Sequence, residues 1–261
     1  LMTGSDLRFE SLHSHTTLSD GVMKHMDVLA AAEELGIGVI AFTDHDALPD
    51  DEVMKQLRDY DGPVGWTVGV ELSSLVPAAV GGAEKGSVHI LGLFVDLAHG
   101  DLVEFCRAAE AGRLARMQRY VEHLRGLGFT ISEADVMSQV PGKAIASPHM
   151  VKALRLHPEN EAVEARLKAE FEAAAEHDEK LAVQLQQTLE DGPNQWPYTL
   201  YMGSGAWKPA PQVKSDNLRS YEDTVQLIRQ AGGVALAAHW YLEPDKMTGD
   251  DLEAVIAAGG L

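Results

Sequence analysis

Short apolar segments alternate with helical patterns through the first hundred residues, and this alternation constrains the fold more than any other feature of the chain. Apolar strand candidates at 38–42, 64–70 and 88–95 are interspersed with segments of helical spacing at 24–35 and 50–60. Such alternation is typical of parallel β-strands connected by crossover helices. The sequence therefore predicts an α/β fold.

The middle third of the chain has a different pattern. Residues 101–126 and 159–190 have helical spacing, and no strand candidate lies between them. We therefore expect a mainly helical insertion at 100–215 that interrupts one α/β domain. The two parts of that domain would be residues 1–99 and 216–261.

The charge of the chain limits its partners. Lys and Arg together number 21 and Asp and Glu together number 40, so the net charge is −19. Most of such a surface repels phosphate backbones, which excludes a general binder of long nucleic acid. The single cysteine, Cys106, excludes a disulfide framework and a cysteine-based zinc site. Without a membrane-length apolar stretch or a signal-peptide pattern, we expect a cytoplasmic protein with no membrane partner.

The segment LHSHTTLSDG at 12–21 is the sharpest local motif. Residues two apart in an extended chain project to the same face, so His13 and His15 can place two imidazoles side by side. Asp20 can return to them from the following turn. Two imidazoles and a carboxylate suit zinc, manganese or iron. Taken alone, the H-x-H pair fits a surface or core pair as well.

Other side chains that can bind metal follow further strand candidates. His45, Glu71 and His239 each lie at or just past the end of an apolar run. In parallel α/β barrels the carboxyl ends of the strands meet on one face, where active sites are built. His89 is the exception, because it lies near the start of its apolar run at 88–95. The placement of the other residues favours a site that binds several metal ions.

Together these motifs resemble the polymerase and histidinol phosphatase (PHP) superfamily. Five of them occur in its order: HSHTTLSDG (13–21), FTDHD (42–46), GVE (69–71), HILG (89–92) and AAH (237–239). The resemblance covers roughly residues 8–95 and 218–245, and it is closest to the stand-alone nucleotide phosphoesterases. It implies a distorted (β/α)7-type barrel with a helical insertion.

The resemblance also implies a centre of two or three divalent ions, which would be manganese, zinc or iron. The implied ligands are His13, His15 and Glu71 for a first ion, Asp20 and His45 for a second, and His89 and His239 for a third. Glu71 would bridge to the third ion, because one carboxylate can neutralise two neighbouring cations.

The chain departs from the family pattern near its end. The final Asp-x-His motif of the superfamily, which supplies a ligand to each of the first two metals, is absent. Gly259 and Gly260 predict the end of a helix, and Leu261 is predicted to start another element. We therefore expect the chain to continue beyond Leu261 and to carry the motif there. The alternative is an incomplete and inactive site.

Several other residues have two possible roles. Asp44 and Asp46 flank His45, and hydrogen bonding to its surroundings is favoured over metal ligation for both. The resemblance places His149 near the substrate phosphate, and an ordinary structural histidine is the alternative. Four aromatic residues could stack on a nucleobase or, as favoured, pack their own proline-rich segment: Trp196, Tyr198, Tyr201 and Trp207.

These observations predict a metal-dependent hydrolase that cleaves a phosphate monoester. The attacking group would be a water activated by the metals, and no protein nucleophile is expected. Cys106 lies in a predicted helix away from the motifs. The expected substrate is a small nucleotide, such as a nucleoside 3′,5′-bisphosphate, or a very short oligonucleotide.

Three alternatives remain at this point. A histidinol-phosphate-type phosphatase is disfavoured because that branch has Cys-x-His where this chain has Leu18-Ser19-Asp20. A catalytically degenerate metal-binding module is favoured only by the absent final motif. A metal-dependent amide hydrolase would carry a modified lysine at a strand end, and no predicted strand ends in lysine.

Overall fold

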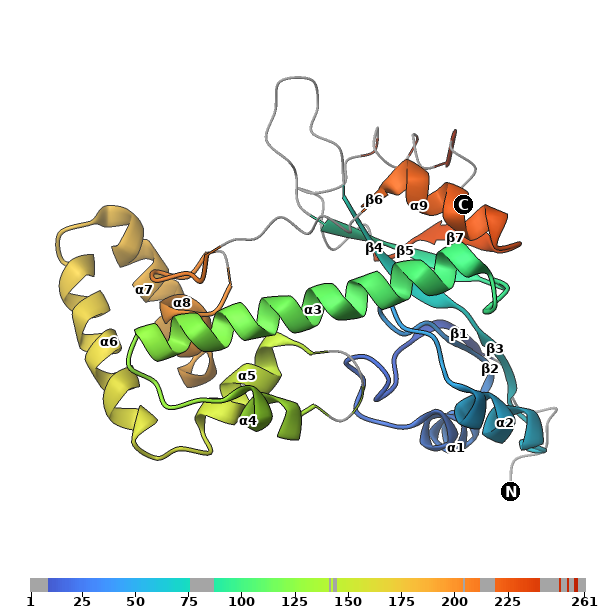
Figure 1. Ribbon diagram of the computed structural model, residues 1–261, viewed down its shortest axis with the longest axis horizontal. Coiled ribbons are helices and arrows are strands. Elements are labelled where there is room, and N and C mark those ends of the chain that lie inside the picture. Colours follow the sequence, from blue (N-terminus) through green and yellow to red (C-terminus); the bar gives the residue numbers. More distant parts are fainter. Residues whose placement is uncertain are drawn as a thin grey trace. The chain divides into compact units, whose positions relative to one another are not determined.

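A computed structural model describes two compact units of the chain (Figure 1). The described residues are 9–75, 87–140, 142, 145–203, 205–211 and 219–239, with the single positions 249, 253, 256 and 257. The first unit comprises residues 1–112, 141–144 and 215–261, and the second comprises 113–140 and 145–214. Each unit has a hydrophobic core of its own. The domain boundaries drawn from the sequence remain a prediction, and the helix stop expected at Gly259 and Gly260 lies outside the described residues.

The first sheet contains three parallel strands. These are β1 (Phe9–Ser14), β2 (Ile37–Phe42) and β3 (Gly65–Val68), in the order β1-β2-β3. Helices α1 (His25–Leu35) and α2 (Asp51–Asp59) lie between successive strands along the chain. The predicted alternation of strands and helices is confirmed in this part of the chain.

The second sheet is mixed rather than parallel. Its strands are β4 (Val70–Leu75), β5 (Ser87–Leu93), β6 (Arg219–Ser220) and β7 (Val234–Ala237), in the order β6-β4-β5-β7. Strand β5 is antiparallel to both β4 and β7. Only residues 76–86 join β4 to β5, fewer than the roughly twelve that a crossover between parallel strands needs. The short connection is consistent with the antiparallel direction of β5.

The two sheets meet where β3 runs into β4. Only Gly69 separates these strands, and its N–H donates to the carbonyl of Phe42 at 2.8 Å. The Glu71 N–H then donates to the carbonyl of Asp44 at 3.1 Å, so pairing continues beyond the end of β2. A Cβ at position 69 would lie 2.4 Å from the carbonyl oxygen of Gly92, which explains the glycine.

The mixed α/β class is confirmed, but a closed (β/α)7-type barrel is not. The strands of the described residues form two open sheets. Helix α9 (Tyr221–Gln230) packs on the second sheet, and its Val225 and Ile228 share a buried core with Ile90. Helix α3 (Gly100–Gly126) adds Phe105 and Cys106 to the same core. Cys106 is therefore buried among apolar side chains.

The second unit is helical. Its elements after the end of α3 are α4 (Glu133–Ser138), α5 (Ser147–Leu154), α6 (Asn160–Ala175), α7 (Glu179–Asp191), a 3-10 turn (Pro193–Gln195) and α8 (Trp196–Leu200). The sequence predicts one helical stretch over 159–190, whereas the structure breaks it between α6 and α7. The Asp178 carboxylate accepts hydrogen bonds from the N–H groups of Lys180 and Leu181 and so starts a new helix.

The aromatic residues of the proline-rich segment pack the second unit. Trp196 and Tyr201 are buried, and Tyr201 donates its hydroxyl to Glu164 at 2.7 Å. Phe171 contacts the rings of both Trp196 and Trp207. For Trp196 and Tyr201 the packing interpretation therefore holds, because neither presents a free face for a base.

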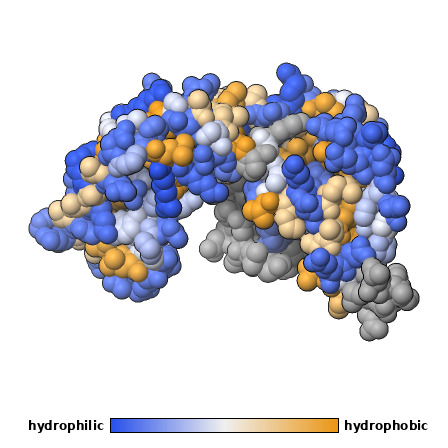
Figure 2. All heavy atoms as spheres, turned by 90° about the horizontal axis from the view of Figure 1, so that it is seen from below, coloured by the Kyte–Doolittle hydropathy of each residue, from blue (hydrophilic) through white to orange (hydrophobic). Residues whose placement is uncertain are grey.

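The visible surface is mostly hydrophilic. Figure 2 shows polar side chains over most of one face, with apolar residues in small groups. No helix within the described part of the chain is both long enough and apolar enough to cross a membrane.

Candidate metal centre

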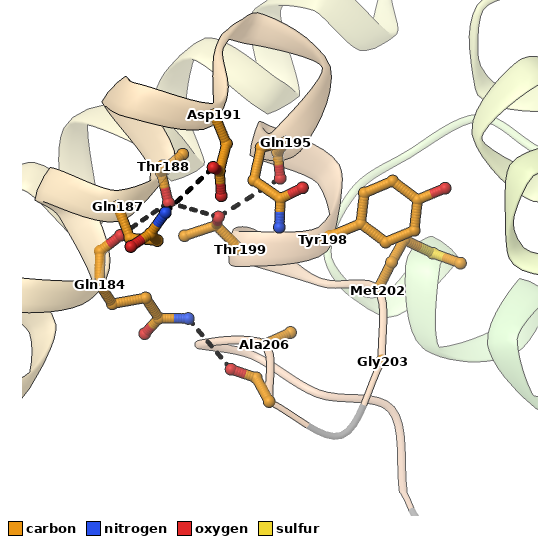
Figure 3. Close-up of a pocket in the computed structure, with 11 residues that line it drawn as sticks. Gln184, Gln187, Thr188, Asp191, Gln195, Tyr198, Thr199, Met202, Gly203 and Ala206 are labelled. Carbon is orange, nitrogen blue, oxygen red and sulfur yellow. Dashed lines mark hydrogen bonds between the residues drawn. The ribbon is translucent and has the colours of Figure 1, made fainter. Parts of the chain in front are cut away.

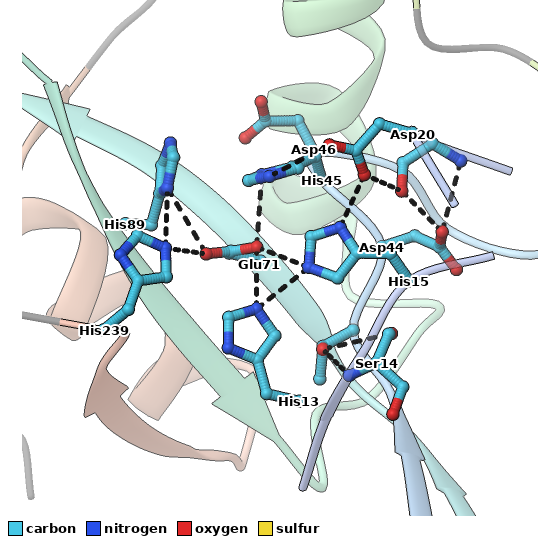
Figure 4. Close-up of polar contacts among 12 residues, drawn as sticks. His13, Ser14, His15, Asp20, Asp44, His45, Asp46, Glu71, His89 and His239 are labelled. Atoms are coloured by element: carbon cyan, nitrogen blue, oxygen red, sulfur yellow. Dashed lines mark hydrogen bonds and ion pairs between the residues drawn. The ribbon is translucent and has the colours of Figure 1, made fainter. Parts of the chain in front are cut away.

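One carboxylate organises a cluster of histidines in the first unit (Figure 4). The residues that the structure brings together are His13 from β1, His15 and Asp20 from the loop after it, His45 from beyond β2, Glu71 from β4, His89 from β5 and His239 from beyond β7. These are all of the metal ligands predicted from the sequence. Their role as ligands is taken up below as a proposal.

Strand direction explains how these residues meet at one end of the sheets. His45 forms an isolated parallel bridge with Glu71, because pairing continues past β2. His89 lies near the start of β5, and the antiparallel course of that strand brings its start to the same end. His239 follows β7, and the neighbouring Ala238 N–H donates to the carbonyl of His89 at 3.0 Å.

Glu71 lies at the centre of the cluster, and its side chain is fully buried. Both of its oxygens are within ion-pair distance of imidazole nitrogens. The distances to Oε2 are 3.0 Å from His13 Nε2, 2.8 Å from His15 Nε2 and 3.3 Å from His45 Nδ1, and those to Oε1 are 3.3 Å from His89 Nδ1 and 3.1 Å from His239 Nε2. The five imidazoles themselves are 20% to 30% exposed, so the cluster is open to solvent.

Asp20 forms the outer side of the cluster. Its Oδ1 lies 2.7 Å from His15 Nδ1, and its Oδ2 lies 3.9 Å from His45 Nε2. His15 and His45 therefore each stand between the buried Glu71 and the half-exposed Asp20. Three overlapping groups result, each with its ligand atoms within 4.8 Å of one another: His13, His15 and Glu71; His15, Asp20 and His45; and His45, Glu71 and His89.

The spacing and chemistry of these atoms fit divalent metal ions. Ligands about 2.0–2.1 Å from a tetrahedral ion lie roughly 3.3–3.4 Å apart. Nε2 of His13 and Nε2 of His15 are 2.9 Å apart, and Nδ1 of His89 is 3.3 Å from Nε2 of His239. A mixed set of imidazole nitrogens and carboxylate oxygens suits zinc, manganese and iron.

The pKa shifts in this cluster favour the ionised form of its two carboxylates. Burial alone raises the pKa of Glu71, yet hydrogen bonds from His13, His15 and His89 hold it well below its usual range. Burial lowers the pKa of His15, but hydrogen bonds to Asp20 and Glu71 outweigh it and raise the value to about 10. In turn, the hydrogen bond from His15 lowers the pKa of Asp20 to about 2. Both carboxylates are therefore ionised and are held by contacts with neighbouring imidazoles.

Asp44 supports the loop that carries Asp20. Its buried carboxylate accepts hydrogen bonds from the N–H of Thr16 at 2.8 Å, the N–H of Ser19 at 3.1 Å and the hydroxyl of Ser19 at 2.6 Å, all on Oδ1. Oδ2 accepts the hydroxyl of Thr16 at 2.9 Å. Asp46 accepts hydrogen bonds from the N–H and hydroxyl of Ser73 at 2.8 and 2.9 Å. These contacts fix the backbone on both sides of the cluster.

Sequence reasoning missed the residues that anchor this loop. Thr16 and Ser19 are both fully buried, although they lie in a polar turn between His15 and Asp20. The T-x-x-S spacing between His15 and Asp20 could have indicated that these hydroxyls share a hydrogen-bond acceptor. His25, which reads as a solvated or structural histidine, is buried against Phe42, with Nε2 3.7 Å from Asp44 Oδ2.

His149 belongs to the second unit. It lies in α5, and its Nδ1 accepts the N–H of Ala146 at 3.1 Å. The ring is buried. A contact between His149 and a substrate remains a prediction.

Comparisons with known proteins agree with this geometry. Residues 11–135 match the family model of the PHP domain. The 5′-3′ exoribonuclease Rnm of Salmonella typhimurium is 28% identical over 55% of this chain and 47% of its own length. The 5′-3′ exoribonuclease of Haemophilus influenzae is 25% identical over 87% of this chain and 67% of its own length. A phosphoribosyl 1,2-cyclic phosphate 1,2-diphosphodiesterase of Eggerthella lenta is 29% identical over 57% of this chain and 55% of its own length.

Two solved structures share the fold. One is a protein of Bifidobacterium adolescentis assigned as a metal-dependent phosphoesterase, with a TM-score of 0.64 and 22% identity. The other is an amidohydrolase of Chromobacterium violaceum that contains sulfate and no metal, with a TM-score of 0.63 and 22% identity. Each match covers 97% of this chain and 75% of the other. By contrast, this chain spans about half the length of the Salmonella relative.

Proposed function

We propose that the chain is a metal-dependent phosphoesterase whose centre surrounds Glu71, a proposal supported by the match of residues 11–135 to the PHP domain. The convergence of five imidazoles on one fully buried carboxylate carries this proposal. A purely structural ion pair needs one partner for a carboxylate, not five. Burying a carboxylate also costs several kcal/mol unless strong partners compensate it, so such a cluster is rarely kept without a use.

Under this proposal the ligands divide into three sets around shared residues. His13, His15 and Glu71 hold a first ion, Asp20 and His45 a second, and His89 and His239 a third, with Glu71 bridging. When bound, such ions polarise a phosphoryl oxygen and acidify a water. The two carboxylates contribute a charge of −2, so two divalent ions leave the centre positive within a chain of net charge −19. A phosphate group is attracted to this positive centre.

The residues of the chain position and charge this centre, and none of them is proposed as a nucleophile. Glu71 is held by its neighbours in the ionised form, and Asp44 fixes the loop that presents Asp20. The hydroxyls of Thr16 and Ser19 both donate to Asp44. Cys106 is buried in the core. We therefore assign the attacking oxygen to water.

The substrate we propose is a small nucleotide or the end of a very short oligoribonucleotide. The names of the Salmonella, Haemophilus and Eggerthella relatives describe an exoribonuclease or a cyclic phosphodiesterase, which favours a phosphoester of ribose. The acidic surface favours short substrates over long RNA. The nucleoside 3′,5′-bisphosphate and the oligonucleotide remain the two candidates. Hydrolysis of the bisphosphate cleaves a monoester bond, and hydrolysis of the oligonucleotide cleaves a diester bond. His149 is retained as a candidate contact to that substrate.

Hydrolysis by the reconstituted protein tests this function. The panel is a nucleoside 3′,5′-bisphosphate, a 5′-mononucleotide, a tetraribonucleotide and bis(p-nitrophenyl) phosphate, each with manganese or zinc and with chelator. We expect metal-dependent cleavage of at least one nucleotide and a loss of about 100-fold or more in Glu71→Gln, because a ligand is removed. Glu172→Gln, an exposed position on α6, is the matched control and should keep the full rate. Equal rates in wild type and Glu71→Gln would contradict the proposal.

A further inference from the structure

A pocket of about 380 Å³ lies within the second unit, between α7, α8 and the loop that follows α8 (Figure 3). Its volume falls in the range of small-molecule sites. Buried Thr188, Thr199, Met202 and Ala206 form its floor. The two threonine hydroxyls are 2.7 Å apart, and Thr188 donates to the carbonyl of Gln184. The floor is therefore fully hydrogen-bonded, and the polar groups available to a ligand lie on the walls.

Three wall residues present acceptors. The Gln187 amide donates to Asp191 Oδ1 at 3.0 Å, and the Gln184 amide donates to the carbonyl of Gly205 at 3.0 Å. Each of these bonds uses one of the two amide N–H groups of its glutamine and so fixes the orientation of the side chain. Asp191 Oδ2 and the amide oxygens of the two glutamines are left as acceptors.

Two further wall residues carry polar groups with no partner within the described part of the chain. These are the side-chain amide of Gln195 and the hydroxyl of Tyr198, both half-buried. Figure 3 shows Gln195 lying between Asp191 and Tyr198. The Gln195 amide can both donate and accept, and the Tyr198 ring adds an aromatic surface beside Met202.

The charge of the walls excludes phosphate as the ligand. All the residues that line the pocket belong to the described chain, and none of them is Lys, Arg or His. Asp191 gives the pocket a negative charge within a chain of net charge −19. A polyamine satisfies Asp191 but offers no acceptor to Gln195 or Tyr198. An uncharged, flat ligand with both donors and an acceptor matches all of these groups at once.

We propose that this pocket binds a guanine base. Among the four RNA bases, guanine alone presents two adjacent N–H donors, N1–H and N2–H, which match a carboxylate such as that of Asp191. Its O6, next to N1, accepts from the amide of Gln195, the residue adjacent to Asp191 in the pocket. Adenine, cytosine and uracil each turn a ring or carbonyl acceptor toward the carboxylate, which is repulsive. This role goes beyond hydrolysis, because it needs no phosphate.

Calorimetric titration of the full chain with nucleosides tests this site. We expect guanosine to bind, and adenosine and cytidine to bind at least about tenfold more weakly, since one mispaired charged contact is worth about 1.4 kcal/mol. Asp191→Asn should weaken guanosine binding by about tenfold or more. The matched control is Glu179→Gln in the first turn of α7, outside the pocket lining. Because Asp191 is exposed, thermal unfolding should confirm that the variant is folded.

Additional titrations distinguish free guanosine from guanine within RNA, and guanine from other ligands. A 2′-O-methyl UGUG tetramer that binds more tightly than guanosine identifies guanine within RNA, and equal or weaker binding identifies the free nucleoside. Equal binding of all nucleosides, tighter binding of spermidine, or no binding at all would overturn the proposal. Glu71→Gln should lose hydrolysis but retain guanosine binding, so a failure of the proposed function and a failure of this site give different results.

Discussion

Replacing Asp44 by alanine is expected to destabilise the loop that carries Asp20. The Asp44 carboxylate is 2% exposed and accepts four hydrogen bonds from Thr16 and Ser19. Hydrogen bonds to a charged group contribute about 1.5–3 kcal/mol each. The full sum is not lost, because the Ser19 N–H also lies 3.1 Å from the Thr16 carbonyl and the two hydroxyls can rotate. We therefore expect Asp44→Ala to cost about 3–5 kcal/mol of unfolding free energy.

Asp44→Asn is the matched variant. An asparagine oxygen in place of Oδ1 keeps the three bonds made there, and its NH₂ group faces the rotatable hydroxyl of Thr16 and, at 3.7 Å, Nε2 of His25. The loss of charge should cost about 1–2 kcal/mol. Urea denaturation measures both variants, and hydrogen exchange at the Thr16 and Ser19 amides reports the loop itself. Equal costs for the two variants, or a cost below about 1 kcal/mol for alanine, would refute this reasoning.

Three further predictions address the metal centre and the sheet. Manganese at 100 times its dissociation constant should raise the unfolding free energy by about 2.7 kcal/mol in denaturant titrations, and an unchanged value means that no ion binds the folded state. The pKa of His15 is raised to about 10 in the folded, metal-free protein. The protonated side chain therefore contributes its full share to the free energy of unfolding below pH 6.5, and this share is lost as the pH rises through about 10. Titrations of His15→Gln should lack this fall. Gly69→Ala should cost about 1–3 kcal/mol, since its Cβ meets the Gly92 carbonyl, and a neutral change would place the strand junction differently.

The sequence predicted the members of the cluster well because they follow apolar runs that must be strands. His45 and His239 come after β2 and β7, so their positions can be inferred from hydropathy alone. The apolar run at 64–70 predicts that Glu71 follows a strand, whereas Glu71 lies inside β4, because the chain continues as a strand beyond Gly69. The prediction found the right residue although it misplaced the strand end.

Features that depend on direction and on pairing could not be predicted. The antiparallel course of β5, which explains the position of His89, depends on the short connection at 76–86 rather than on its own residues. The family resemblance implies a distorted (β/α)7-type barrel, yet the described strands form two open sheets. The role of Asp44 was also hidden, because its four donors lie 25 to 28 residues earlier in the chain.

The number of metal ions bound by the chain tests the central claim most directly. Metal-free protein can be equilibrated with manganese by dialysis, and the metal can be counted per chain by atomic spectroscopy. Wild type and Glu172→Gln should each bind at least two ions, and Glu71→Gln should bind fewer, because Glu71 lies between the ligand groups. An absence of bound metal in wild type, or the same number of ions in Glu71→Gln, would contradict a metal centre at Glu71.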